Sequence, residues 1–275
     1  MRERTKQRLA RLARDFHVLN GIDFLLYLRD RARWRGSNRR FARSHPGFIA
    51  PPAPLAFDAF GYTSHEAYLE SGLEHARYIA QIARDHASPS GLRVLEWGCG
   101  PGRIIRHLPG LLGDQAAEVV GVDLSPKTIE WCRASIPGIR FERNELQPPL
   151  PFADGHFGFV YAISVFTHLD EAAWTRWMHE LGRVMTEDGV LLFTTHGQHY
   201  LPKLLADEAE LFTTGRPVFR AKIDQGKKRF TAFHPPEFVR GHLPDGFRVR
   251  SHTESPDVPG LKQDVWLVTR SGPER

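Results

Sequence analysis

The sequence predicts an α/β fold: a mostly parallel seven-stranded sheet with helices on both faces, preceded by a basic helical arm. Three observations predict it. Short apolar strands alternate with helices after Pro89, and the last two strands have no helix between them. The first 45 residues hold 13 Lys and Arg against 4 Asp and Glu. A chain of 275 residues has room for one sizeable domain and an accessory segment.

The charge and the cysteines exclude several classes of protein. The net charge is +5, and residues 1–45 carry +9, so the remainder carries 5 − 9 = −4. The basicity therefore belongs to the arm, which disfavours a body built to bind nucleic acid. Cys99 and Cys132 form neither a disulfide framework nor a zinc-type spacing, so we expect reduced, packed thiols and no metal site. No run of about 18 apolar residues occurs, and the apolar run 24–28 is too short for a signal peptide, so we expect a cytoplasmic protein.

Residues 1–57 are interpreted as a helical arm followed by a proline-rich linker. Residues 9, 12, 16 and 19 are apolar and share one helical face, and Asn20-Gly21 is expected to break that helix before a second apolar and basic stretch over 22–34. Four prolines within 44–57 predict an extended linker. The arm fits peripheral contact with an anionic membrane, RNA binding, pairing with another subunit to form an oligomer, or packing on the body.

The body, residues 58–275, is expected to begin with a helix over 62–85. Seven strands are then predicted, at 92–97, 118–122, 139–142, 157–163, 190–195, 247–252 and 264–269. Helices are predicted from 104, over 126–134 behind a Ser125-Pro126 cap, and over 171–185. The final two strands, joined by a polar segment, predict an antiparallel hairpin at one sheet edge.

The first strand ends in a glycine loop, and the second ends in an acid. The loop contains Gly98, Gly100 and Gly102, which let the backbone approach a ligand closely because no Cβ intrudes. Asp123 follows Gly102 by 21 residues, at a place where a carboxylate can accept both hydroxyls of a ribose. A dinucleotide-binding enzyme would show the same two features.

Three details separate the two interpretations. The glycines run G-x-G-x-G and not G-x-G-x-x-G, and Pro101 stands among them. Glu96 precedes the loop, where a carboxylate would repel a pyrophosphate but attract an ammonium group. The terminal hairpin is foreign to the usual dinucleotide fold. Over residues 62–270 the chain resembles the class I, Rossmann-like methyltransferases that use S-adenosylmethionine. Within that family its motifs most resemble those of uncharacterised bacterial enzymes that act on small molecules or glycans.

The resemblance implies a set of cofactor-binding residues. Segment 119–125 is similar to the family's second motif, with Asp123 and Leu124 at the ribose. Segment 141–145 is similar to the adenine-lining segment, where the family commonly has Asp and this chain has Asn144 and Glu145. Segment 161–169 is similar to the fourth-strand motif, beside the methionine part, and segments 179–181 and 189–193 to the helix and strand that follow. The implied contacts are Glu96, Gly98, Cys99, Gly100, Gly102, Asp123, Leu124, Asn144, Glu145, Ser164 and His168.

The acceptor side is expected after the fifth strand. His196 follows that strand at the ligand edge, and His titrates near neutrality, so we expect His196 to be the general base or the residue that orients the acceptor, with His199 second. A histidine that caps a helix or bonds within a loop is the alternative. Residues 197–233 form an insertion that we interpret as an acceptor lid. Enzymes that methylate exocyclic nitrogens of nucleic-acid bases carry Asn/Asp-Pro-Pro-aromatic after the fourth strand, and this chain has Ile-Ser-Val-Phe at 163–166.

The expected reaction is methyl transfer to a hydroxyl oxygen of a small molecule or glycan-type acceptor. N- or C-methylation, a catalytically silent cofactor-binding scaffold and an NAD-dependent oxidoreductase are the alternatives. The sequence leaves the acceptor's identity open.

Overall fold

The structure is a computed structural model that describes residues 19–88, 90–220 and 230–270. The chain forms two compact units, residues 1–68 and 69–275, which are described separately. None of the helices within these described ranges is long and apolar enough to cross a membrane.

In the N-terminal unit, helix α2 (Leu19–Ser44) runs without interruption. Asn20 and Gly21 lie in its first turn, and the helix that was expected to end at them lies outside the described residues, so that break stays a prediction. Polar bonds join the middle of α2 to the segment after the linker: Asp30 Oδ2 accepts from the amide and the hydroxyl of Thr63, at 2.6 and 2.9 Å. Asn38 Nδ2 donates to Thr63 O at 2.8 Å.

The linker is not extended throughout, because it contains helix α3 (Ala53–Phe60). Pro52 is the N-cap, and a further proline lies in the first turn, where no backbone N–H is needed for the helix. Gly61, with φ of 76°, ends α3 in the left-handed conformation. The prolines, which led us to expect extended chain, instead start a helix.

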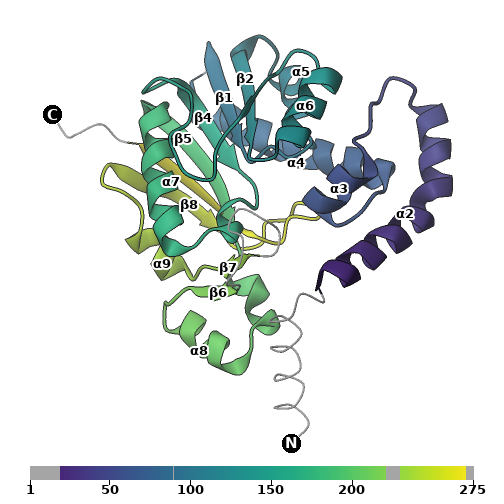
Figure 1. Cartoon of the computed structure of the whole chain (residues 1–275). Helices are drawn as coiled ribbons and strands as arrows, with labels where there is room; N and C mark the ends of the chain where they lie inside the picture. The colour runs from purple at the N-terminus through teal and green to yellow at the C-terminus, as the bar shows by residue number, and fades with distance from the viewer. Residues whose placement is uncertain (1–18, 89, 221–229, 271–275) are drawn as a thin grey trace, which may run out of the picture. The chain divides into compact units, whose positions relative to one another are not determined.

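The body is built on a seven-stranded sheet with the order β3-β2-β1-β4-β5-β9-β8 (Figure 1). Its strands are β1 (Leu92–Trp97), β2 (Ala116–Asp123), β3 (Arg140–Arg143), β4 (Phe157–Ala162), β5 (Met185–Thr195), β8 (Phe247–Thr253) and β9 (Asp264–Arg270). Strands β1 to β5 are parallel, and β9 is antiparallel to both β5 and β8. The predicted fold is confirmed, with one refinement: the last strand inserts between β5 and β8, which leaves β8 at the edge.

Helices cover both faces of the sheet (Figure 1). One core lies under α4 (His65–His86), α5 (Leu108–Leu112) and α6 (Pro126–Ser135), and includes Ile79, Leu108 and Ile129. The other lies under α7 (Glu171–Val184) and α9 (Pro236–Gly241), and includes Trp174, Trp177 and Val239. The strands between two apolar layers are apolar on both sides, as the sequence predicted.

The helix expected from residue 104 is broken into two short pieces. A 3₁₀ turn η1 (Ile105–His107) precedes α5, and Pro109 lies in the first turn of α5. An α-helix starting at Ile105 would need a hydrogen bond from residue 109 to its carbonyl, and proline has no N–H to give. The Leu108 amide bonds to Ile105 O in its place.

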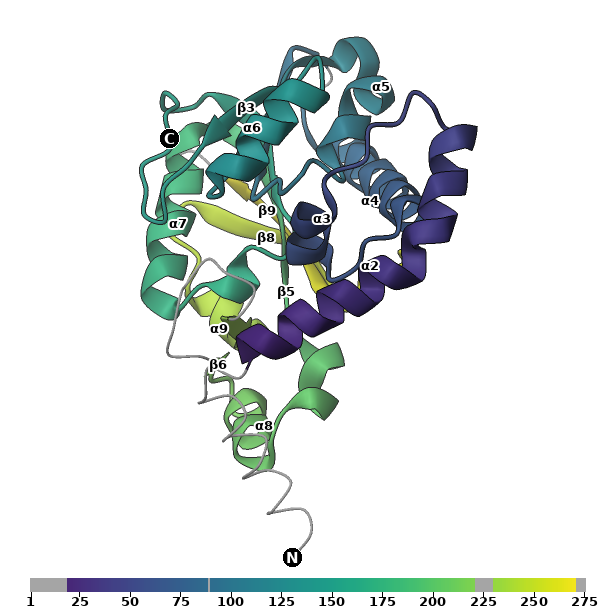
Figure 2. The same ribbon diagram turned by 45° about the vertical axis from the view of Figure 1, so that its right-hand side comes forward.

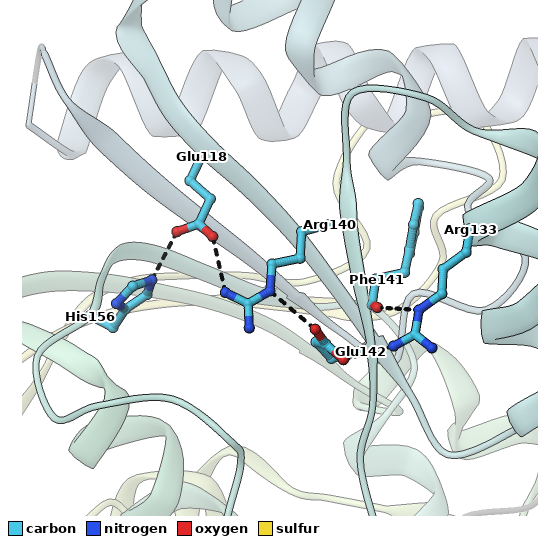
Figure 3. Close-up of polar contacts among 6 residues, drawn as sticks. All are labelled: Glu118, Arg133, Arg140, Phe141, Glu142 and His156. Carbon is cyan, nitrogen blue, oxygen red and sulfur yellow. Dashed lines mark hydrogen bonds and ion pairs between the residues drawn. The ribbon is translucent and has the colours of Figure 1, made fainter.

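Charged side chains cover the β3 edge of the sheet (Figure 3). Arg140 lies between Glu118 and Glu142, at 3.5 and 3.2 Å, and His156 meets Glu118 at 2.8 Å. Arg133 of α6 donates to Phe141 O at 2.8 Å. Paired charges on an edge strand discourage pairing with another chain. This network lies at the outer edge of the sheet, and none of its residues is among the predicted ligand contacts.

The insertion after β5 folds into small elements of its own (Figure 2). It contains the 3₁₀ turn η4 (Gln198–Lys203), helix α8 (Ala206–Thr213) and an antiparallel pair, β6 (Val218–Arg220) with β7 (Thr231–Phe233). Phe212, Val218 and Phe233 form its small core. Residues 221–229 of the predicted lid lie outside the described residues.

Candidate cofactor and acceptor site

The glycine loop is tied to the end of β2 by its backbone. The amides of Gly98 and Cys99 both donate to Val122 O, at 2.8 and 2.9 Å. Gly98 has a φ of 78°, and a Cβ there would lie 2.3 Å from Val165 Cγ2. Both the conformation and the space therefore require glycine. The loop lies at the carboxyl ends of β1, β2 and β4, the edge at which open parallel sheets bind ligands.

Asp123 closes β2 and faces the loop. Its Oδ2 accepts from the Gly100 amide at 3.0 Å, and its Oδ1 accepts from the Ser125 amide at 2.9 Å. Asp123 thus shapes the loop and the start of α6, where Ser125 caps the helix through Thr128 N as predicted. Leu124 is half-buried beside it.

Cys99 contributes its backbone and points its side chain inward. Its Sγ is buried and donates to Gly100 O at 3.4 Å, and Cys132 Sγ donates to the same carbonyl at 3.5 Å. Both cysteines are free thiols, as the sequence predicted. In the described part of the chain no cluster of three or more His, Cys, Asp or Glu could hold a metal ion.

Glu96 is a buried acid under the loop. It is 3% exposed, and Tyr161, its neighbour across the β1–β4 ladder, donates to its Oε2 at 2.8 Å. Burial raises the pKa of Glu96 to about 8, although the Tyr161 hydroxyl and the charge of Arg103 act in the opposite direction. Glu96 is therefore largely protonated at neutral pH until a cation comes close.

The two residues proposed for the adenine differ in burial. Asn144 is buried, whereas Glu145 is exposed and pairs with Arg143 at 3.2 Å. Asn144 Nδ2 donates to Glu145 O at 2.8 Å, which fixes the amide orientation. Asn144 Oδ1 is buried and has no hydrogen-bond partner within the described residues. A buried carbonyl oxygen of this kind requires a donor, and an exocyclic amino group supplies one.

The end of β4 holds a strained residue. Ser164 has a φ of 62°, which is rare for a residue other than glycine. Its amide donates to Thr194 Oγ1 at 2.8 Å, and its hydroxyl donates to Gln263 Oε1 at 3.0 Å. These bonds, together with a third from Thr194 Oγ1 to Gln263 Oε1 at 2.5 Å, hold the turn across β4, β5 and the start of β9.

Two histidines that follow β4 and β5 are held by alternate carbonyls of the insertion. His168 Nδ1 lies 2.6 Å from Phe230 O, and His196 Nδ1 lies 3.0 Å from Ala232 O. A carbonyl only accepts, so each Nδ1 carries the proton, and the neutral ring of His196 presents Nε2 as an acceptor. Burial lowers the pKa of His196 to about 4. Its ring is therefore neutral at physiological pH.

His199, the second predicted base, is exposed, and its ring stands edge-on to Tyr200, with ring centroids 5.6 Å apart. Tyr200 packs against His196, at 4.2 Å between centroids. His234 lies before α9 and is buried.

Sequence reasoning missed a buried acid at the same edge. Asp264 begins β9 and is fully buried, and its Oδ2 meets His252 Nε2 of β8 at 2.9 Å. A Cβ at Gly197 would lie 1.9 Å from the same oxygen, so only glycine fits after His196. Asp264 and His252 lie near one edge because β8 and β9 are antiparallel. The predicted hairpin implied that the two residues lie near one edge. Their pairing could not be predicted, because it depends on the register between β8 and β9.

These residues fit S-adenosylmethionine. The loop packs closely against Val165 because Gly98 lacks a Cβ, Glu96 offers a buried carboxyl group for an ammonium group, and Asn144 Oδ1 lacks a donor. An ammonium group beside Glu96 would favour its ionised carboxylate, whereas a pyrophosphate would gain no such attraction.

Comparisons with known proteins agree. Residues 94–189 match a family model described as a methyltransferase domain. Curated relatives are malonyl-[acyl-carrier protein] O-methyltransferases of Legionella pneumophila, 35% identical over 108 residues (38% of this chain and 36% of the relative), and of Enterobacter lignolyticus, 31% identical over 149 residues (53% and 55%). The chain thus spans about a third to a half of these relatives' length. A solved S-adenosylmethionine-dependent methyltransferase from Mesorhizobium loti shares the fold with a TM-score of 0.51, at 19% identity, over 71% of this chain and 98% of that one.

The strand order and the glycine-loop edge are those of a Rossmann-like domain. More narrowly, residues 94–189 match a methyltransferase domain, and the fold is shared with a solved S-adenosylmethionine-dependent methyltransferase.

Proposed function

We propose that this protein transfers a methyl group from S-adenosylmethionine to a hydroxyl oxygen of a small-molecule or glycan-type acceptor. His196 carries the proposal, because an imidazole held by Ala232 O offers Nε2 at the sheet edge that also bears the glycine loop. The names of both curated relatives specify transfer to oxygen, which supports the same atom here.

The geometry supports a set of cofactor contacts. Asp123, already held by two loop amides, would bind the ribose hydroxyls beside Leu124, and Asn144 would accept from the adenine amino group. Glu96 would face the ammonium group. The glycines of the loop and the backbone at Ser164 and His168 would line the methionine part. When bound, the cofactor supplies a methyl group on a sulfonium, which is a good leaving group.

The protein's own task is to orient the acceptor and remove its proton. In-line displacement depends on holding the nucleophile in place, and a dry site prevents competition by water. As the new carbon–oxygen bond forms, the acceptor hydroxyl becomes a protonated ether, a far stronger acid than imidazolium. A base whose conjugate acid has a pKa of about 4 therefore suffices, and His196 Nε2 takes the proton.

A carboxylate is the second acceptor to test, because the relatives' names specify a malonyl group. A carboxylate carries no proton at neutral pH and needs no base. The two acceptors therefore predict different consequences of losing His196: a large loss of turnover for a hydroxyl and a small one for a carboxylate.

The test begins with calorimetry of the full chain against S-adenosylmethionine, S-adenosylhomocysteine and NADH. We expect S-adenosylmethionine and S-adenosylhomocysteine to bind and NADH not to bind. Binding of NADH alone would support an oxidoreductase and overturn the proposal. Transfer of labelled methyl is then measured on phenols, sugars, amines and malonyl thioesters. Turnover only on amines or carbon acceptors would refute oxygen transfer, and cofactor binding with no turnover on any acceptor would support a silent scaffold.

The N-terminal arm is proposed to contact anionic membranes. The observation that favours this is a cluster of exposed apolar side chains near the start of α2, namely Phe24, Leu25, Leu26 and Leu28, on a helix rich in arginine. Removing residues 1–45 should abolish sedimentation with vesicles of phosphatidylglycerol and leave cofactor binding intact. Equal sedimentation of both forms would refute membrane contact, and an oligomer that disperses on the same deletion would assign the arm to subunit pairing. Cytoplasmic location stays a prediction.

A further inference from the structure

Glu96 and Tyr161 form a buried acid pair that the reaction itself does not use. They are direct neighbours across the parallel β1–β4 ladder, and the Tyr161 hydroxyl donates to Glu96 Oε2 at 2.8 Å. Tyr161 is completely buried and Glu96 is 3% exposed. A carboxylate in such a place is costly when ionised, unless a cation and hydrogen-bond donors meet it.

We propose that Tyr161 is a cofactor-positioning residue: its hydroxyl fixes the orientation of Glu96, whose buried carboxyl group is protonated in the free protein and releases that proton to solvent when the cofactor's ammonium group binds beside it. The inference rests on the proposed function, because it requires S-adenosylmethionine in the crevice. The bond from Tyr161 to Oε2 leaves Glu96 with one fixed orientation before and after the proton leaves.

The other groups that face Glu96 do not already neutralise it. Arg103, after the loop, and the backbone amide of Ile105 favour the carboxylate, whereas the charge of Asp123 on β2 opposes it. Cys99 interacts with the same group from the loop. Arg103 is shared with α4, since its Nη1 donates to Ser71 Oγ at 3.2 Å and its Nη2 meets His75 Nδ1 at 3.1 Å. Burial outweighs these contributions and raises the pKa of Glu96 to about 8.

Cofactor affinity should therefore depend on pH with a defined slope. An acid with a pKa of about 8 is roughly 90% protonated at pH 7, so binding should release about 0.9 protons there. Affinity should rise about 20-fold between pH 6.0 and 7.5 and level off above pH 8, because fewer proteins then have a proton to lose.

The experiment is calorimetry of the full chain with S-adenosylhomocysteine, which keeps the ammonium group, at pH 7.0 in two buffers of different ionisation enthalpy. We expect release of about 0.9 protons from the wild type and close to none from Glu96→Gln. Tyr78→Phe, which removes a hydroxyl from α4 away from the pair, is the matched control and should match the wild type.

Tyr161→Phe separates positioning from packing. Without the hydroxyl, ionised Glu96 loses a charge-assisted bond, so the midpoint of the affinity profile should rise by about one pH unit with the fold intact. A midpoint unchanged by Tyr161→Phe would overturn the role of Tyr161. Binding by the wild type without proton release would overturn the proton exchange and leave the proposed function standing, whereas no binding at any pH would refute the proposed function itself.

Discussion

The carboxyl edge of the sheet has two halves that are built differently. The cofactor half, at the ends of β1, β2 and β4, depends on short segments, so that Glu96, Gly98 and Gly100 lie within five residues of one another. The proposed acceptor half, at the end of β5 and the start of β9, joins His196 to Ala232 and packs Gly197 against Asp264. The difference implies that the first half keeps its shape with little help from the rest of the chain, whereas the second depends on the insertion and the terminal hairpin.

The largest effect should come from the buried acid of the cofactor half. The folded state raises the pKa of Glu96 from 4.5 to about 8, so it binds more protons than the unfolded chain between those values. Its contribution to stability is complete below pH 4.5 and is lost as pH rises through 8. Glu96→Gln, which cannot ionise, should gain stability over the wild type across that range, by up to roughly 5 kcal/mol.

Urea unfolding of both proteins at several pH values measures this difference. The histidines with lowered pKa values (His75, His107, His196 and His234) are common to both proteins, so their effect on stability cancels in the difference. Between pH 6.5 and 8 the difference should grow by about 1.3 kcal/mol per pH unit at first and by about half of that at pH 8. Parallel profiles for the two proteins would mean that Glu96 is ionised in the free protein.

On the acceptor half, His196→Ala should lower kcat about 10³-fold with a hydroxyl acceptor, because no other base replaces Nε2. Cofactor affinity should not change, since His196 belongs to the other half. His199→Ala is the matched control: its exposed ring should be dispensable, with kcat within about twofold of the wild type. Wild-type kcat should fall only below pH 5, as His196 becomes protonated. Full turnover by His196→Ala would remove its role as base.

The same difference explains what the sequence could predict. The alternation of strands and helices, Asp123 at the end of β2 and the Ser125 cap were predicted because each depends on a local pattern. The bonds of His168 to Phe230 and of His196 to Ala232 were not, because they join residues 62 and 36 positions apart. Two predictions near prolines were wrong. The prolines near α3 start a helix where extended chain was expected, and Pro109 divides the helix that was expected from residue 104. Proline fixes local backbone geometry, but its neighbours decide whether a helix begins or stops there.

Asp123→Asn tests whether the cofactor half is held together by this one carboxylate. The amide cannot accept from Gly100 and Ser125 through two equivalent oxygens, and it loses the charge that strengthens both bonds. We expect affinity for S-adenosylhomocysteine to fall about 30-fold, measured by calorimetry. Asp114→Asn, at an exposed position before β2, should bind normally. Unchanged affinity in Asp123→Asn would mean that Asp123 is only a cap for α6.

The smallest effect separates two neighbouring residues at the adenine. Asn144 Oδ1 is buried, and its amide is oriented by the bond from Nδ2 to Glu145 O, so Asn144→Ala should weaken S-adenosylhomocysteine binding about 10-fold. Glu145→Ala should leave binding unchanged, because that carboxylate is exposed and pairs with Arg143. S-inosylhomocysteine, which lacks the 6-amino group, isolates the contact: Asn144→Ala and the wild type should bind it equally. A 10-fold loss with this analogue too would show that Asn144 supports the loop and does not recognise the amino group. The adenine contact would then belong to the backbone, and the cofactor half would depend on Asp123 and Glu96 alone for its polar side chains.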